Sequence, residues 1–278
     1  MRSIVIPAHN EERSIGRLLT ALAPLARDTE IIVAANGCRD RTVEVARTAA
    51  PWATVLDLPE PSKAAAMSIG DAAATGFPRL YLDADAQLSV AAVRLLFDTL
   101  DSPGGPLAVA ASPEYDLTRS TWVVRSHHAF WRSLPSHRNA LMGTGAMGVS
   151  AAGRGRFGDW PRTLADDYFL DGQFGPDEKR RVPGAVTGLV GARGYLDLIS
   201  RRARIHQGND DAVAAGLRSA HTGGGAGGTL STLRRQPRLV VHLPAHLAVS
   251  FGARGLAWWR RRRGVSGTWY RDTSREAG

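Results

Sequence analysis

A chain of 278 residues with 44% hydrophobic and 22% charged residues has the composition of a soluble globular protein that can bury a substantial core. The formal net charge of +9 is uneven, because residues 232–278 carry ten arginines against two acidic residues and the rest of the chain is nearly balanced. The single cysteine excludes an internal disulfide and predicts a reducing cytoplasm, and residues 3–7 resemble a core strand rather than a secretory leader.

Strands and helices alternate through the first part of the chain. The expected strands are residues 3–7, 30–34, 54–58 and 80–82, and helical patterns lie around residues 15–22, 43–46, 64–74 and from Ser89 onward. This alternation predicts an α/β, Rossmann-like fold with a mostly parallel central sheet and helices on both faces.

Asp83 and Asp85 directly follow the fourth expected strand, in the segment Tyr81-Leu-Asp-Ala-Asp-Ala-Gln87. Open α/β sheets bind ligands at the carboxyl ends of their strands. Two carboxylates one residue apart can hold a divalent metal ion beside a diphosphate. Taken alone, such a pair more often starts a turn or caps a helix, here the one from Ser89, and the surrounding motifs reverse that preference.

Six motifs occur in a fixed order. They are Ile4-Val-Ile-Pro-Ala-His-Asn-Glu-Glu12, Asn36-Gly-Cys-Arg-Asp40, Lys63 with its following helix, Leu82-Asp-Ala-Asp85, Gly143-Thr-Gly-Ala-Met-Gly148 and Ala165-Asp-Asp167. In this order the chain resembles the inverting glycosyltransferases of family 2, which have a GT-A fold. The resemblance covers residues 1–90 and 142–170, whereas 91–141 and 171–278 match only loosely.

The resemblance implies a division of the chain. Residues 1–228 are the expected GT-A catalytic domain, with a nucleotide-binding half over 1–90 and an acceptor-binding half over 91–228. A basic, amphipathic helical extension follows over 229–278. The glycine-rich stretch 223–228 is typical of a flexible linker.

The resemblance also assigns the donor site. It makes Asp85 a ligand of Mn²⁺ or Mg²⁺ that bridges the diphosphate, while Asp83 supports the ribose and a metal-bound water. Pro7, Ala8 and Glu11 match positions that line the nucleoside, and Glu11 is a candidate for binding the ribose hydroxyls.

Asn36 and Lys63 complete the expected nucleotide site. Asn36 stands where many relatives of the family have an aspartate that binds uracil. The Asn36 amide can still accept and donate hydrogen bonds. UDP is therefore the expected nucleotide, while GDP or another nucleotide stays open. The alternative for Asn36 is a left-handed turn residue before Gly37. Lys63 and Lys179 are the only lysines among 35 basic residues, which suggests that a compact ammonium is needed at Lys63. Its alternative is a solvent-exposed loop lysine.

The pair Asp166-Asp167 stands where the family has its general base. An inverting displacement needs one carboxylate that takes the acceptor proton opposite the leaving group. Asp167 is the expected base, with Asp166 orienting it, although the assignment between the neighbours is open and the pair could be only an N-cap. Gly143, Thr144 and Gly145 are expected to form the acceptor-side wall, where glycine allows close backbone approach.

The basic C-terminal part has two interpretations. Leu239 to Ala253 is apolar apart from two histidines, and Trp258-Trp259 leads into Arg260-Arg-Arg-Arg263. This order suits peripheral contact with an anionic membrane at its inner face, and the alternative is an amphipathic helix packed on the catalytic domain. A membrane span is not expected, because the charge-free stretch is shorter than the roughly 20 residues that a span needs. Nucleic-acid binding is not expected, because no recognition motif accompanies the basic run.

We therefore expect a cytoplasmic, metal-dependent inverting glycosyltransferase that moves one sugar from a nucleotide-sugar, with a UDP-sugar as the expected donor, to an acceptor hydroxyl. One alternative is a retaining GT-A glycosyltransferase of the glucosyl-phosphoglycerate synthase type, which shares the opening motif and the Asp-Ala-Asp segment. The other is a non-catalytic sugar-nucleotide-binding protein, against which the intact Asp83, Asp85 and Asp167 argue. A nicotinamide dehydrogenase is set aside, because no Gly-x-Gly-x-x-Gly follows the first strand.

Overall fold

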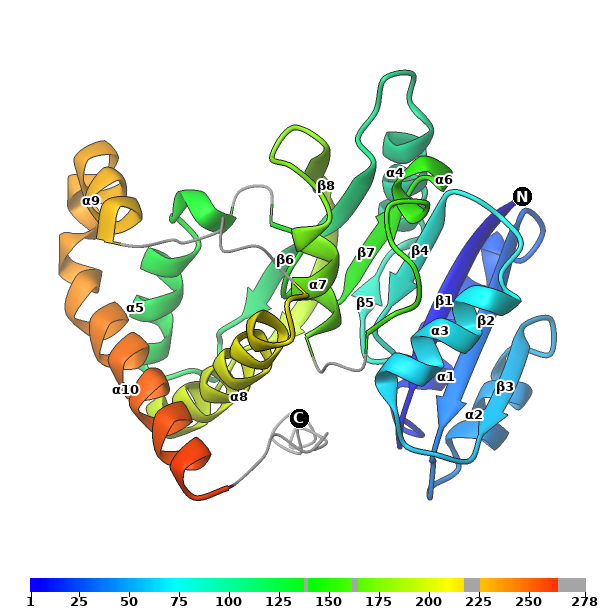
Figure 1. Cartoon of the computed structure of the whole chain (residues 1–278), viewed down its shortest axis with the longest axis horizontal. Helices are drawn as coiled ribbons and strands as arrows, with labels where there is room; N and C mark the ends of the chain where they lie inside the picture. The colour runs from blue at the N-terminus through cyan, green and yellow to red at the C-terminus, as the bar shows by residue number, and fades with distance from the viewer. Residues whose placement is uncertain (138–139, 162–164, 218–225, 265–278) are drawn as a thin grey trace. The chain divides into compact units, whose positions relative to one another are not determined.

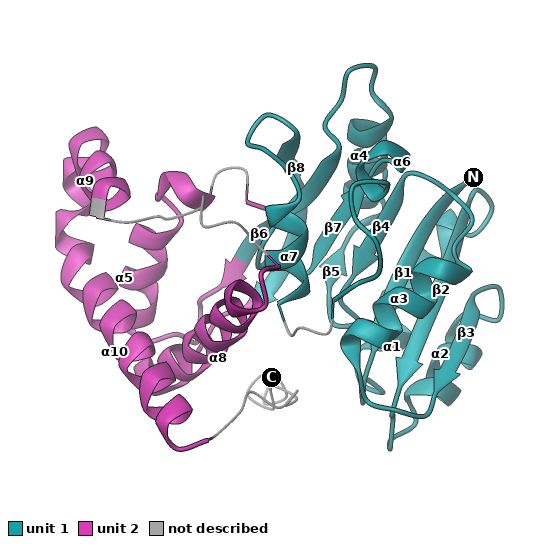
Figure 2. Ribbon diagram, in the orientation of Figure 1, with its two compact units in different colours: residues 1–114, 141–189 teal, residues 115–140, 190–278 magenta. Residues whose placement is uncertain are grey.

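The computed structural model describes residues 1–137, 140–161, 165–217 and 226–264, so residues 223–225 of the predicted linker lie outside the described part. The chain forms two compact units (Figure 2). Unit 1 comprises residues 1–114 and 141–189, and unit 2 comprises residues 115–140 and 190–278. The boundary predicted at residue 228 separates a catalytic domain from a C-terminal extension. The two compact units do not test this functional division, which stays a prediction.

Unit 1 is built on a mixed sheet (Figure 1). Its strands are β1 (Arg2–Ala8), β2 (Thr29–Asn36), β3 (Thr54–Leu58), β4 (Arg79–Leu82), β5 (Gln87–Leu88), β6 (Ala108–Asp116), β7 (Ala146–Val149) and β8 (Lys179–Val190), in the order β3-β2-β1-β4-β7-β6-β8-β5. The pairs β1–β2, β1–β4 and β2–β3 are parallel. The pairs β4–β7, β6–β7 and β5–β8 are antiparallel. The expected α/β fold is thus confirmed, and the first four strands form a parallel part of the sheet.

Helices cover both faces of this sheet. They are α1 (Ile15–Leu22) with the 3₁₀ turn η1 (Ala23–Leu25), α2 (Thr42–Ala49), α3 (Lys63–Ala73), α4 (Val90–Asp101), α6 (Ala151–Arg154) and α7 (Asp166–Gly172). Alternate β1 residues Ile4 and Ile6 join the apolar sides of α1 and α4 in one core. The other face contacts α3, where a Cβ on Gly70 would lie 2.6 Å from Val5 Cγ1. The small residues of α3 therefore bring its backbone close to the strands that carry the site.

Unit 2 is mainly helical. Its elements are α5 (Trp122–Trp131), η2 (Pro135–His137), α8 (Tyr195–Ala214), α9 (Ala226–Arg235), η3 (Pro237–His242) and α10 (Leu243–Arg262). Helix α10 packs on α5 and α8, and the expected C-terminal helix is confirmed. Among the described residues, the helical stretch Pro237–Arg262 is long and apolar enough to cross a membrane by length and composition alone, with a mean hydropathy of 1.2 and 28% of its window buried.

Candidate active site

Lys63 connects two acidic segments of unit 1. It is the first residue of α3, which Ser62 caps by accepting a hydrogen bond from Ala65 N. Its Nζ lies 3.0 Å from Asp83 Oδ1 and 3.1 Å from Asp166 Oδ1. The lysine side chain is only 19% exposed, so the alternative of a solvent-exposed lysine is wrong. Burial alone would lower the pKa of Lys63, but attraction to Asp166 and Asp83 outweighs burial and raises it, so the ammonium stays charged.

Asp83 and Asp85 lie in the turn that follows β4, at the end of the parallel half of the sheet. The backbone N–H of Asp83 donates to the carbonyl of Gly145 at 2.9 Å, which fixes the turn beside the neighbouring loop. The Asp83 side chain is 44% exposed. Helix α4 is capped by Ser89, whose Oγ accepts from Ala92 N at 3.1 Å. The interpretation of the aspartate pair as a helix cap is therefore wrong.

The loop before β7 places backbone groups beside these carboxylates. Gly143 and Gly145 have φ values of 68° and 66°, a left-handed conformation that favours glycine. The N–H of Gly143 donates to Asp167 Oδ2 at 2.7 Å. A Cβ on Gly145 would lie 3.6 Å from Asp83 Oδ2, so glycine keeps the space next to that carboxylate open. The hydroxyl of Thr144 is buried and bonds within its own loop.

Asp166 and Asp167 form the first turn of α7, where the helix dipole favours negative charge. The N-cap residue is Ala165, so the interpretation of the pair as only an N-cap is wrong. Burial raises the pKa of Asp166 in spite of the Lys63 ammonium. Burial and repulsion by Asp166 raise the pKa of Asp167 to about 6, although the Gly143 N–H and Lys63 act in the opposite direction. Asp167 thus has a pKa close to neutral pH, as a general base needs.

The ends of β1 and β2 hold the residues expected to line the nucleoside. Pro7 and Ala8 are buried at the end of β1. The Asn36 side chain is fully buried, donates to Ala8 O at 2.8 Å and accepts from Ser62 N at 3.0 Å. Asn36 thus links β1 to the start of α3. The backbone of Asn36 is not left-handed, whereas that of its neighbour Gly37 is, so the alternative of a left-handed turn residue is wrong. Contact of Asn36 with a nucleotide base stays a prediction.

Glu11 lies in the loop between β1 and α1. Its backbone N–H donates to Thr42 Oγ1 at 2.7 Å, and its carboxylate accepts from Ser14 Oγ. These bonds hold the loop against the start of α2. A contact of Glu11 with ribose hydroxyls stays a prediction.

Lys179, the first residue of β8, and Asp171 of α7 form a second buried ion pair that the sequence did not assign to the site. Lys179 Nζ lies 2.8 Å from Asp171 Oδ1 and donates to the Asp171 carbonyl at 2.7 Å. The same Oδ1 accepts from Leu141 N at 2.9 Å, at the start of the loop before β7. Both lysines of the chain therefore bind carboxylates of α7. The sequence signal that identified Lys63 was the small number of lysines in the chain. The same signal could have identified Lys179.

Asp71 in α3 organises a further buried network. Its carboxylate lies 2.5 Å from Arg79 Nη1 and 2.6 Å from Arg154 Nε, and it accepts from the Tyr81 hydroxyl at 2.5 Å. Burial and the Asp71 charge raise the pKa of Tyr81 well above its usual range. The network ties α3 and α6 to β4, the strand that leads to the aspartate pair. No local motif marks it, because Arg154 is 83 residues away.

The expected metal ion would bind at the two aspartates after β4. The described residues contain no group of three or more His, Cys, Asp or Glu side chains that could hold a metal. Asp83 and Asp85 are hard oxygen donors in an accessible turn, and they fit Mn²⁺ or Mg²⁺ if diphosphate and water supply the other ligands. This is the usual way in which proteins hold Mg²⁺.

Comparison with known proteins gives the family. Residues 3–157, more than half of the chain, match the model of glycosyl transferase family 2, and the chain belongs to this family. It is therefore a glycosyltransferase. No curated protein matches the chain.

Two similar solved structures are glycosyltransferases. The mannosyltransferase PcManGT from Pyrobaculum calidifontis, in complex with GDP-Man and Mn²⁺, has a TM-score of 0.59 and 16% identity over 99% of this chain and 82% of that one. Glucosyl-3-phosphoglycerate synthase from Mycobacterium tuberculosis, in complex with Mn²⁺, UDP and glucosyl-3-phosphoglycerate, has a TM-score of 0.48 and 22% identity over 70% of each chain. The first similarity shows that the fold is that of a GT-A glycosyltransferase.

Proposed function

We propose that this glycosyltransferase moves a sugar from a nucleoside-diphosphate sugar to an acceptor hydroxyl, with inversion at the anomeric carbon and with the help of a divalent metal ion. The observation that carries this proposal is the position of Lys63. Its ammonium lies between Asp83, at the strand end where a diphosphate is expected, and Asp166, next to the expected base Asp167. Groups suited to a diphosphate and a group suited to accept a proton therefore share one site.

The leaving group develops two negative charges as the sugar–oxygen bond breaks. When bound at Asp85 and Asp83, Mn²⁺ or Mg²⁺ would neutralise part of this charge. The charged Lys63 adds a fixed cation at the same strand end. The glycine at position 145 leaves space beside Asp83 for the donor.

Asp167 takes the proton in this proposal. As the acceptor oxygen attacks the anomeric carbon, its O–H proton passes to the Asp167 carboxylate. The bond between the anomeric carbon and the diphosphate oxygen breaks, and its electrons leave with the nucleoside diphosphate. Gly143 N and Tyr168 N each donate to one Asp167 oxygen at 2.7 Å, which fixes the carboxylate plane. Each oxygen keeps a second lone pair for the acceptor hydroxyl.

The nucleotide is proposed to be UDP, with GDP as the nucleotide to test beside it. The Asn36 amide already bonds to Ala8 and Ser62, so base recognition needs further groups. PcManGT was solved with GDP-Man and Mn²⁺, which favours including GDP-sugars and Mn²⁺ in the assays.

Donor hydrolysis tests the proposal without a known acceptor. UDP- and GDP-sugars are incubated with the protein and Mn²⁺ or excess EDTA, and the released nucleotide is measured. We expect release in Mn²⁺ that is lost in EDTA and in Asp85→Asn, and kept in the control Asp57→Asn, an exposed aspartate on β3. Equal release in EDTA and Mn²⁺ would show that the metal assignment is wrong.

The anomeric outcome separates the two reaction types. The initial configuration of the released sugar, read by NMR, should be opposite to that of the donor. Retention would instead favour a retaining transferase of the glucosyl-phosphoglycerate synthase type.

A further inference from the structure

Helix α10 of unit 2 has two different faces. Small and apolar side chains on one face are buried against α5 and α8, among them Ala245, Val249 and Ala253. Polar bonds at its C-terminal end secure the same packing: Arg260 Nη2 donates to Ser200 Oγ at 2.8 Å and Arg261 Nη2 to Asp211 Oδ1 at 2.7 Å. The alternative interpretation of the tail, an amphipathic helix packed on the rest of the chain, therefore accounts for this one face only.

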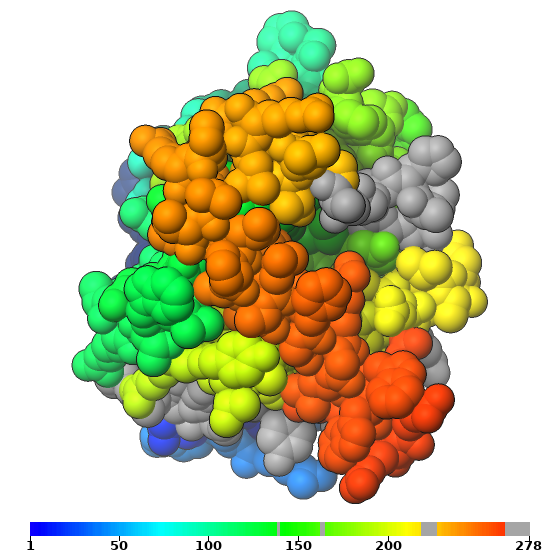
Figure 3. Space-filling model, turned by 90° about the vertical axis from the view of Figure 1, so that its left-hand side faces the viewer, coloured from blue at the N-terminus to red at the C-terminus, as the bar shows by residue number. Residues whose placement is uncertain are grey.

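The opposite face of η3 and α10 is exposed and mostly apolar, and the exposed Arg254 interrupts it between Phe251 and Trp258. In Figure 3 its orange and red surface faces the viewer. The exposed fractions are 55% for Val240, 63% for Val241, 38% for Leu247, 66% for Phe251, 55% for Trp258 and 43% for Trp259. Single exposed apolar residues are ordinary, but a row of them along one helix marks an interaction surface.

Arginines lie at the C-terminal end of this exposed face. The guanidinium groups of Arg262 and Arg263 lie 4.1 Å and 4.6 Å from the ring centroids of Trp258 and Trp259. Indole rings with stacked cations are typical of the level of lipid headgroups, where one part of the side chain is apolar and the other is hydrated.

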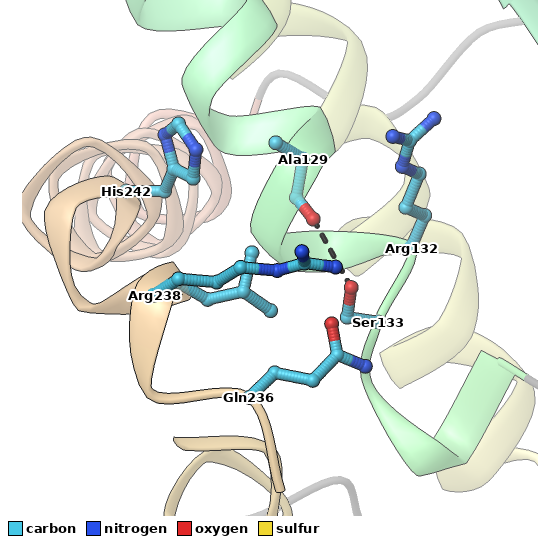
Figure 4. Close-up of a pocket in the computed structure, with 7 residues that line it drawn as sticks. Ala129, Arg132, Ser133, Gln236, Arg238 and His242 are labelled. Atoms are coloured by element: carbon cyan, nitrogen blue, oxygen red, sulfur yellow. Dashed lines mark hydrogen bonds between the residues drawn. The ribbon is translucent and has the colours of Figure 1, made fainter.

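Arginines also lie at the N-terminal side of the face. A cavity of about 400 Å³ lies there and is lined by Arg132, Gln236, Arg238 and His242 (Figure 4). In the described part of the chain, neither Arg132 nor Arg238 has an ion-pair partner. The sequences of α5, α9, η3 and α10 contain no Asp or Glu. The apolar face thus lies between two cationic ends without a compensating acid on these helices.

The packing against α8 distinguishes lying on a membrane from crossing it. Helix α8 carries charged side chains along its length, including the ion pair Asp197–Arg201 with an Nε–Oδ1 distance of 2.9 Å. A crossing α10 would take this helix toward the hydrocarbon region, where charged side chains are strongly unfavourable. An orientation in the plane of the interface keeps α8 in water.

We propose that the exposed face of η3 and α10 binds the surface of a bilayer that contains anionic lipid. The apolar side chains enter the headgroup region, and the arginines at both ends bind lipid phosphates. Charge complementarity selects this occupant, because a purely apolar partner would leave the arginines at both ends unpaired. The proposal goes beyond the proposed function, and binding does not depend on the sugar reaction.

Vesicle sedimentation of the full chain tests the proposal. The vesicles are phosphatidylcholine alone, or phosphatidylcholine with about one third phosphatidylglycerol. We expect the protein to sediment with the anionic vesicles at low salt, to do so less with phosphatidylcholine alone, and to be released by added salt. Phe251→Ser/Trp258→Ser should lower the apparent partition coefficient at least about tenfold. Arg262→Ser/Arg263→Ser and Arg132→Ser/Arg238→Ser should lower binding to the anionic vesicles only.

The matched control is Trp52→Ser/Arg47→Ser on the surface of unit 1, which should sediment like the wild type. Because Phe251 and Trp258 are more than half exposed, their replacement should leave the melting temperature and donor hydrolysis unchanged. Failure of the wild type to bind anionic vesicles at low salt would overturn the proposal, as would unchanged binding by Phe251→Ser/Trp258→Ser. A dimer that this double variant abolishes, without any vesicle binding, would assign the face to a second copy of the chain instead.

Discussion

Lowering the pH through about 6 should slow sugar transfer by protonating Asp167. Burial and repulsion by Asp166 raise the pKa of Asp167 to about 6, and a protonated carboxyl cannot take the acceptor proton. With that pKa, about nine-tenths of the sites are ionised at pH 7 and about one tenth at pH 5. We therefore expect kcat/KM to fall about tenfold between these values, as measured by nucleotide release across the pH range.

Two variants assign this pH dependence to a residue. Asp167→Asn keeps an oxygen for the Gly143 N–H, so nucleotide affinity should hardly change while kcat falls at least about 10²-fold. Its residual rate should lose the pH dependence near 6. Asp166→Asn removes the repulsion, so the acidic limb should move to lower pH, with a smaller loss of rate. An unchanged kcat in Asp167→Asn, or a wild-type profile that is flat from pH 5 to 7, would refute the role of this carboxylate.

Substitutions at Lys63, Lys179 and Gly70 test contacts that support the site. Lys63→Met should lower nucleotide release strongly and weaken metal-dependent nucleotide binding, whereas Lys63→Arg should keep part of both, because the charge remains. Lys179→Met leaves the buried Asp171 carboxylate without its cation. It should lower the free energy of unfolding, measured by urea denaturation, by about 3–5 kcal/mol. The double variant Lys179→Met/Asp171→Asn should recover part of this loss. Gly70→Ala places a methyl group 2.6 Å from a β1 side chain and should destabilise by about 1–3 kcal/mol. The matched Gly255→Ala on α10 meets nothing within 4 Å and should stabilise slightly.

The parallel half of the fold could be predicted from the sequence because its signals are local. Each strand there is a short apolar run followed by a helix, and the small residues of 64–74 form α3 at Lys63–Ala73. The later strands of the sheet could not be predicted in this way. β7 pairs with β4 across a long stretch of chain, and part of that stretch, residues 115–140, belongs to unit 2. Periodicity within one segment carries no information about such a pairing.

The site shows the same limit at the level of side chains. Motif order identified Lys63, Asp83 and Asp166 one by one, but not that a single ammonium contacts both carboxylates. The Lys179–Asp171 pair was missed because nothing beside either residue in the sequence requires a buried partner. The amide of Asn36 bonds within the protein, and only the packing of β1, β2 and α3 decides this.

The central claim is that the aspartates after β4 bind a nucleoside diphosphate through a divalent metal ion, and the most direct test is calorimetric titration of UDP and GDP with and without Mn²⁺. We expect Mn²⁺ to tighten the binding of one of them at least about tenfold in the wild type and to have no effect in Asp85→Asn. Nucleotide affinity that is independent of Mn²⁺, or a Mn²⁺ effect that survives in Asp85→Asn, would contradict the claim.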